Sequence, residues 1–225
     1  MAVRTERYLE IISELRDKAT LVAVSKVRTV SEIMELYELG QRDFGENYVQ
    51  ELVEKHMILP DDIRWHFIGH LQSNKVKLIA PFIDLIHGID SFKLLTEVDK
   101  QGRKNGRIIS CLLQVHIAQE ETKFGLSEQE LDELITGLKN SAAADEFNNI
   151  SVEGLMGMAS NTDDVDKLEA EFTYLNALFD KYSPIQLPNL RFKTLSMGMS
   201  SDYKLAIQHG INMVRIGSLL FGPRK

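Results

Sequence analysis

The sequence has only one cysteine, no long hydrophobic run and no excess of basic residues. Cys111 therefore cannot form an internal disulfide, which is typical of a reducing compartment, and its apolar neighbours indicate a place in the core. No apolar stretch is long enough to cross a membrane, and residues 1–10 lack the apolar segment of a secretion signal. We therefore predict a cytoplasmic protein without membrane association.

The charge balance and the histidines argue against two further classes of function. Twenty-six basic and thirty-three acidic residues give a net charge of −7, so nonspecific nucleic-acid binding is not expected. His66 and His87 lie in or beside apolar segments, without a carboxylate or a second histidine at metal-ligand spacing. We interpret both histidines as structural and expect no metal site.

The sequence does contain a repeated alternation of strand and helix patterns. An amphipathic helix pattern over residues 8–15 comes first, and the apolar run 21–24 is typical of a strand buried on both faces. Capping boxes at residues 29–32 and 127–130 mark the starts of two later helices. The strand patterns cover residues 21–24, 42–44, 65–68, 84–87, 110–117, 152–156, 194–196 and 213–216.

Eight strands, each followed by a helical segment, predict an α/β protein built as a single (β/α)8 TIM barrel with an extra N-terminal helix. Equal division of the chain gives roughly 28 residues per unit, which suits that fold. No break in composition marks a linker, so we expect one domain over residues 1–225. Because segments 42–44, 84–87 and 194–196 are short, a doubly wound open sheet remains an alternative.

The residues that follow the strands are the candidates for a site, because ligands of parallel α/β folds bind at the carboxyl ends of strands. Lys26 directly follows the first strand, where a neutral amine could attack a carbonyl and form a Schiff base. The alternative is a lysine that merely solvates a loop. The other residues expected on this face are 25, 46–47, 70–72, Gly88, Gln119, Met158, 196–201 and 217–218.

The segments after the last two strands suit an anion. Residues 196–201, Ser-Met-Gly-Met-Ser-Ser, offer hydroxyls, a glycine and the N–H groups of a helix start. Gly217 allows close backbone approach and Ser218 adds a hydroxyl, while Arg215 needs a partner if it is buried. Barrels commonly bind phosphate at these two loops, although serines that only cap a helix are an equal alternative.

Seven motifs lie in order along nearly the whole chain. They are Ala23-Val-Ser-Lys26, Phe44-Gly-Glu-Asn-Tyr-Val-Gln-Glu51, Trp65-His-Phe-Ile-Gly69, Leu71-Gln-Ser-Asn-Lys75, Gly154-Leu-Met-Gly-Met158, Leu195-Ser-Met-Gly-Met-Ser200 and Val214-Arg-Ile-Gly-Ser218. Together they resemble the pyridoxal 5′-phosphate (PLP) homeostasis protein family. The resemblance implies a fold similar to the N-terminal barrel domain of alanine racemase, and PLP as the cofactor.

The resemblance also implies a role for each cofactor-binding residue. It implies that Lys26 carries PLP as a Schiff base and that Arg215 faces the pyridine nitrogen. Phosphate contacts are expected from Ser200, Gly217 and Ser218, and Ser196 and Asn47 are expected nearby. His70 and Phe124 depart from the residues common in the family, which puts local loop shape in doubt.

The function implied by the resemblance is that of a PLP carrier or buffer in intracellular PLP homeostasis, a monomer without robust catalysis and with PLP-dependent apoenzymes as possible recipients. A cation at the ring nitrogen would keep that nitrogen unprotonated and weaken the ring as an electron sink. The chain ends just past the eighth strand, leaving no room for the further β-domain whose tyrosine is the second acid/base of alanine racemases.

Two alternatives use the same lysine. One is a minimal PLP-dependent amino-acid racemase or lyase, and the other is a Schiff-base aldolase that forms its imine directly with a sugar phosphate. Lys75 and Lys123 could form a secondary cofactor site or a relay, and the sequence does not separate that from surface charge.

Overall fold

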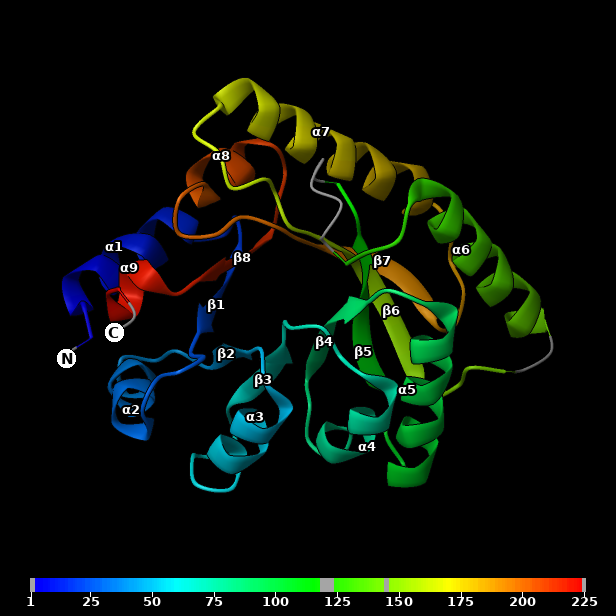
Figure 1. The fold of residues 1–225 in the computed structure, drawn as a ribbon, viewed down its shortest axis with the longest axis horizontal. Coiled ribbons are helices and arrows are strands. Elements are labelled where there is room, and N and C mark those ends of the chain that lie inside the picture. The colour runs from blue at the N-terminus through cyan, green and yellow to red at the C-terminus, as the bar shows by residue number, and fades with distance from the viewer. Residues whose placement is uncertain (1–2, 118–123, 144–145, 224–225) are drawn as a thin grey trace.

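The computed structural model of the chain describes residues 3–117, 124–143 and 146–223, and its strands close into a parallel barrel (Figure 1). Because the last strand pairs with the first, the predicted (β/α)8 barrel is confirmed and the open sheet is wrong. The strands are β1 (Thr20–Val24), β2 (Asp43–Glu46), β3 (Arg64–Phe67), β4 (Leu85–Ile89), β5 (Ile109–Val115), β6 (Ile150–Gly157), β7 (Leu190–Ser196) and β8 (Met213–Ile216).

The helices surround the barrel as the alternation predicts (Figure 1). The extra N-terminal helix buries Tyr8, Ile11 and Leu15 and lies beside the last helix. No helix in the described part of the chain is long and apolar enough to span a membrane. The helices are α1 (Thr5–Leu15), α2 (Val30–Glu38), α3 (Val49–His56), α4 (Val76–Ile79), α5 (Phe92–Asn105), α6 (Glu128–Ala143), α7 (Val165–Tyr182), α8 (Tyr203–Gln208) and α9 (Ser218–Phe221), with a 3-10 turn η1 (Ser73–Lys75) before α4.

Both predicted capping boxes are confirmed. The Thr29 hydroxyl accepts from the Glu32 amide while the Glu32 carboxylate accepts from the Thr29 amide, and Ser127 and Glu130 repeat this exchange at α6. Each box satisfies backbone groups that a helix end leaves without partners.

Two strands extend past the glycine at which the predicted strand stopped. Gly45 pairs in register with His66 inside β2, and Gly88 lies inside β4. A Cβ added to Gly45 would lie 2.9 Å from Val22 Cγ1, so this position allows neighbouring strands to approach inside the barrel. Strand β7, predicted from three residues, has seven.

Two apolar cores flank the sheet. The larger core lies between strands and helices and includes Trp65 and Cys111, which confirms core packing for the cysteine. Burial raises the pKa of the Cys111 thiol. The smaller core fills part of the barrel interior, and its buried members are Val22, Leu85, Leu112, Met156 and Met213.

Candidate functional site

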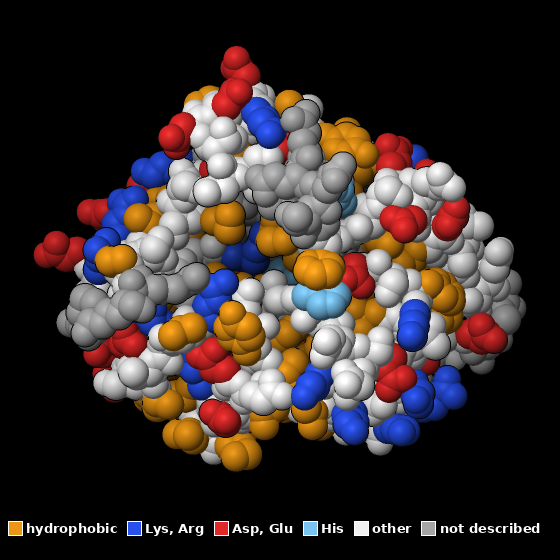
Figure 2. All heavy atoms as spheres, in the orientation of Figure 1, with side chains coloured by type: hydrophobic (Ala, Val, Ile, Leu, Met, Phe, Trp, Pro, Cys, Tyr) orange, Lys and Arg blue, Asp and Glu red, His pale blue; other side chains and the backbone are white. Residues whose placement is uncertain are grey.

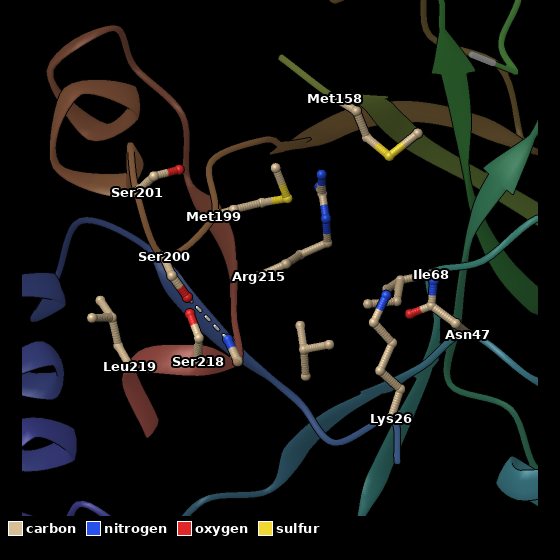
Figure 3. A pocket seen from close by; sticks show the side chains of 12 residues that line it. Lys26, Asn47, Ile68, Met158, Met199, Ser200, Ser201, Arg215, Ser218 and Leu219 are labelled. Carbon is tan, nitrogen blue, oxygen red and sulfur yellow. Dashed lines mark hydrogen bonds between the residues drawn. The ribbon is translucent and has the colours of Figure 1, made fainter. Parts of the chain in front are cut away.

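A cavity of about 650 Å³ opens at the carboxyl ends of the strands. Figure 2 shows a hollow near the centre of one face with basic side chains inside it. Figure 3 shows Lys26 and Asn47 at one end of the cavity and Ser200 and Ser218 at the other, with Arg215 between them. The cavity is lined by Val24, Lys26, Asn47, Ile68, Met158, Met199, Ser200, Ser201, Arg215, Gly217, Ser218 and Leu219.

The backbone on both sides of Lys26 is held by side chains of α3. Lys55 Nζ donates to the carbonyl of Ser25 at 2.7 Å, and Glu51 Oε1 accepts from the Val27 amide at 2.6 Å. Val27 has φ 60°, a left-handed conformation that costs a β-branched residue energy and persists only where its surroundings impose it. The chain therefore turns sharply just after Lys26, and α3 fixes that turn.

A buried ion cluster lies behind this turn. Lys55 Nζ contacts Glu46 Oε1 at 2.6 Å and Glu51 Oε1 at 2.7 Å, and Glu46 also accepts from the Ser25 hydroxyl at 2.6 Å. Burial raises the pKa of Glu46, against the opposing effects of Lys55 and Ser25. Glu46 was expected on the ligand-binding face, but it instead points to α3 and anchors the residue before Lys26.

The serine end of the cavity is shaped by the loop between β7 and α8. Gly198 has φ +88°, and an added Cβ would lie 2.8 Å from the Ala206 Cβ, so a larger residue would strain this loop. The Met199 amide donates to Asp202 Oδ1 at 2.5 Å, and the Gly217 amide donates to the Ser200 hydroxyl at 3.4 Å. These bonds bring the two loops after β7 and β8 together around one space.

Arg215 is buried, and its guanidinium donates to two neutral oxygens. Its NH1 group donates to Ser196 Oγ at 2.7 Å and its NH2 group to the carbonyl of Gly157 at 2.9 Å. Burial lowers the pKa of Arg215 to about 10, and the charge of Asp202 acts in the opposite direction. The side chain is therefore still a cation at neutral pH, held by hydrogen bonds at one wall of the cavity.

The two interior histidines have partners that sequence spacing does not show. His66 Nδ1 lies 2.9 Å from His87 Nε2, and His66 Nε2 lies 3.1 Å from Asp43 Oδ1. His87 Nδ1 lies 3.2 Å from Ser196 Oγ. Neither histidine has a carboxylate or a second histidine at metal-ligand spacing in the sequence, and these contacts arise instead because the strands that carry the residues lie side by side. No cluster of three or more His, Cys, Asp or Glu side chains that could hold a metal ion occurs among the described residues.

Six of the seven predicted cofactor-binding residues line the cavity. They are Lys26, Asn47, Ser200, Arg215, Gly217 and Ser218. Ser196 does not line it but is fully buried beneath Arg215. Met158 lines it as expected, Gly88 lies within a strand, and Gln119 lies outside the described residues.

Other residues that were expected on the ligand-binding face line a smaller neighbouring hollow of about 210 Å³. It is lined by His70, Gln72 and Lys75, and it shares Asn47 with the main cavity. Lys75 and Lys26 line different hollows, and Lys123 lies outside the described residues, so the secondary cofactor site or relay considered for Lys75 and Lys123 stays a prediction.

His70 and Phe124, the two residues that depart from the family pattern, contact one another. The His70 and Phe124 rings stack with their centroids 4.1 Å apart, and His70 Nδ1 lies 3.1 Å from Asp90 Oδ2. The loops that follow β3, β4 and β5 are thus joined at this point. Of the cavity residues, the apolar Val24, Ile68 and Leu219 were not predicted, since none carries a group that signals chemistry.

The chain matches known proteins over nearly its whole length. Residues 5–225 match the family model for the alanine racemase N-terminal domain. The pyridoxal phosphate homeostasis protein of Pasteurella multocida (strain Pm70) is 38% identical over 207 residues, covering 91% of this chain and 86% of the relative. That of Aquifex aeolicus (strain VF5) is 36% identical over 230 residues, covering 99% and 97%.

Solved structures agree with these matches. PipY of Synechococcus elongatus PCC7942 with PLP bound is 34% identical with a TM-score of 0.85, covering 96% of this chain and 99% of PipY. Alanine racemase from Bartonella henselae with covalently bound pyridoxal phosphate is 18% identical with a TM-score of 0.69, covering 95% and 56%, which shows a shared fold. This chain is thus a member of the pyridoxal phosphate homeostasis protein family, built on the alanine racemase N-terminal domain fold.

Proposed function

We propose that this protein binds PLP as a Schiff base on Lys26 and serves intracellular PLP homeostasis without robust catalysis of its own. The observation that carries the proposal is that one cavity has Lys26 at one end, two serine loops at the other and the Arg215 cation between them. These three features match the aldehyde, the phosphate and the ring nitrogen of PLP. The family name and the PLP in the PipY structure support the same assignment.

The residues present fit this cofactor. Ser200, Gly217 and Ser218 would hold the phosphate through hydroxyl and N–H groups, and a cavity of about 650 Å³ lies within the range of small-ligand sites. Arg215 would donate to the pyridine nitrogen. Asn47 Oδ1 is buried and makes no hydrogen bond within the described part of the chain, so a bound polar group would relieve its desolvation.

The lining residues favour a carrier over an enzyme. PLP supplies an electron sink when bound, but a cation at its ring nitrogen keeps that nitrogen unprotonated and weakens the sink. Racemisation by two bases needs a second acid/base opposite the lysine. Within the described residues that line the cavity there is no tyrosine, histidine or carboxylate, and Lys26 is the side chain suited to accept a proton.

The setting we propose is a cytoplasmic, single-domain monomer over residues 1–225. The composition, with one cysteine and a net charge of −7, supports a reducing compartment and argues against nucleic-acid binding. PLP-dependent apoenzymes are the proposed recipients, because a reversible Schiff base can pass to the lysine of another protein.

An absorption titration tests cofactor binding. Adding PLP to the wild-type protein should produce the visible band of a Schiff base, and Lys26→Ala should abolish it. Lys77→Ala, which removes an exposed lysine of α4, is the matched control and should keep the band. A protein that stays colourless with PLP, or a band that survives in Lys26→Ala, would overturn the assignment.

A second experiment tests the alternative of a minimal racemase or lyase. Such an enzyme would exchange the α-hydrogen of a free amino acid with deuterium from the solvent at a useful rate. We expect no such exchange across a broad panel of amino acids with the PLP-loaded protein. Rapid exchange with one amino acid would contradict the carrier function and leave PLP binding intact.

A further inference from the structure

A line of polar side chains crosses the inside of the barrel from the cavity to the opposite opening. Arg215 NH1 lies 2.7 Å from Ser196 Oγ, which lies 3.2 Å from His87 Nδ1. His87 Nε2 lies 2.9 Å from His66 Nδ1, and His66 Nε2 lies 3.1 Å from Asp43 Oδ1. Bulky aliphatic residues normally fill the interior of such barrels, so this polar sector costs packing and needs a reason.

The hydrogens of this line can be assigned from its two ends. Hydrogen bonds from His66 and Arg64 outweigh burial and keep the pKa of Asp43 low, so its carboxylate can only accept. His66 must then carry its hydrogen on Nε2, which leaves Nδ1 as an acceptor for His87 Nε2–H. His87 Nδ1 accepts from the Ser196 hydroxyl, and the Ser196 oxygen accepts from Arg215. Every hydrogen therefore points from Arg215 toward Asp43.

We propose that Asp43, His66, His87 and Ser196 are positioning residues for Arg215, forming one directed hydrogen-bond chain that holds the guanidinium at the ring-nitrogen position of the cofactor. This inference rests on the function proposed above, since it assumes that Arg215 faces PLP. It assigns a role to four residues on four different strands, none of which lines the cavity.

The hydrogen-bond chain explains how the buried Arg215 cation is held although its direct partners are neutral acceptors. Asp43 provides a negative charge at the far end, and Arg64 fixes that carboxylate with bonds of 2.7 Å from Nε and 2.5 Å from NH2. Asp202 adds a carboxylate whose charge acts on Arg215 from the loop before α8. Asp43 also lines a polar hollow of about 400 Å³ at the amino ends of the strands, so solvent reaches the Asp43 end of the hydrogen-bond chain.

The direction of the hydrogen bonds, from Arg215 toward Asp43, depends on both histidine rings being neutral. A proton added to His66 would place a hydrogen on Nδ1, and His87 Nε2 would have to accept it. His87 would then donate from Nδ1 to Ser196, and the Ser196 hydrogen would lose its acceptor. Burial lowers the pKa of His87 well below its usual value, and the charge of Arg215 acts in the same direction, which agrees with a neutral His87.

Nitrogen-15 NMR of the histidine side chains tests the direction of the chain in the protein without added PLP. Of the six histidines, His66 and His87 are assigned by the loss of their signals in His66→Gln and His87→Gln. We expect both rings to be neutral at neutral pH with the hydrogen on Nε2. A hydrogen on Nδ1 of either ring, or a protonated ring, would overturn the proposal whether or not PLP binds.

The affinity for PLP tests the positioning role. The carboxamide of His87→Gln can accept from Ser196 and donate to His66, whereas His87→Leu can do neither. We expect His87→Leu to weaken PLP binding about tenfold and His87→Gln to stay within about twofold of the wild type. Unchanged affinity in a folded His87→Leu, or equal loss in both variants, would overturn the role.

A second pair of variants covers the case in which His87→Leu does not fold. Ser196→Ala removes the link next to Arg215, and Ser196→Thr keeps a hydroxyl, so we expect the same difference in affinity between them. Equal PLP affinities of Ser196→Ala and Ser196→Thr would overturn the positioning role. If the wild-type protein fails to bind PLP, the proposed function fails, and the NMR result still decides the direction of the chain.

Discussion

At the scale of single residues, the position of Lys26 depends on the buried cation of Lys55, which lies on α3. Lys55 is 6% exposed, and it donates to the carbonyl of Ser25 as well as to Glu46 and Glu51. A buried ion pair adds little net stability when it is intact, but removal of one partner leaves an uncompensated charge. Lys55 therefore links the stability of the fold to the geometry around Lys26.

Lys55→Met should lower the free energy of unfolding by about 3 kcal/mol, because the buried Glu46 and the partly buried Glu51 lose their counter-charge. Chemical denaturation measures the loss, and Lys93→Met at an exposed site is the control. The double variant Lys55→Met with Glu46→Gln should recover part of the stability, since it removes one of the two orphaned charges. A loss below about 0.5 kcal/mol in the single variant would contradict the buried-cluster account.

Sequence reasoning found the residues whose chemistry follows a strand end and missed those whose partners lie on other strands. Lys26 and Ser218 follow strands and Arg215 lies near the end of one, and all three line the cavity. The contact between His66 and His87 depends on the register of β3 and β4, which spacing along the chain does not give. Strand parity was an available signal, because alternate residues of a strand face the same side.

At the scale of elements, the loop between β7 and α8 sets the serine end of the cavity. Its Gly198 combines a positive φ with a close approach to α8, whereas Gly40 after α2 has a positive φ but open space around it. A substitution at Gly40 therefore measures the cost of the backbone conformation alone, whereas the same substitution at Gly198 also displaces the loop that shapes the site.

Gly198→Ala and Gly40→Ala should each destabilise the fold by about 1 to 2 kcal/mol, because alanine pays for a left-handed conformation. Gly198→Ala alone should also weaken PLP binding, by about tenfold, since the loop must move to admit the Cβ. Thermal unfolding and PLP titration of both variants give the two quantities. Equal PLP affinity in the two variants would show that this loop does not position the phosphate end.

The element boundaries show why strand prediction failed at two glycines. Gly45 and Gly88 look like turn residues in sequence, yet both lie within strands, where side chains approach Gly45 closely and a backbone carbonyl approaches Gly88. A Cβ on Gly88 would lie 2.8 Å from the carbonyl oxygen of Gly69. Helix starts were predicted better, because capping is a local interaction between residues three apart.

At the scale of the whole molecule, one part of the barrel interior is apolar and another part is polar. Apolar side chains such as Val22 and Met156 fill one part, and the chain from Arg215 to Asp43 fills another. The fold class could be predicted from the alternation of strands and helices, since eight such units suit a closed barrel. The polar interior could not, because it arises from pairing between strands far apart in sequence.

The buried histidine gives the whole molecule a pH-dependent stability. His87 has a lowered pKa when folded, so only the unfolded chain gains a proton there as the pH falls below about 6.5. The unfolding free energy should therefore fall below that pH, by at most about 1.4 kcal/mol per pH unit for this one proton. His87→Gln should reduce that slope, as measured by urea unfolding at several pH values. An unchanged slope in the variant would contradict a neutral, buried His87.

The central claim is that Lys26 is the single covalent attachment point for PLP. Reduction of the PLP-loaded protein with borohydride, followed by peptide mass analysis, tests it most directly, because reduction makes the linkage permanent. The account predicts one adduct with the mass of reduced PLP, on the peptide that contains Lys26. An adduct on another lysine, or none on Lys26, would contradict it.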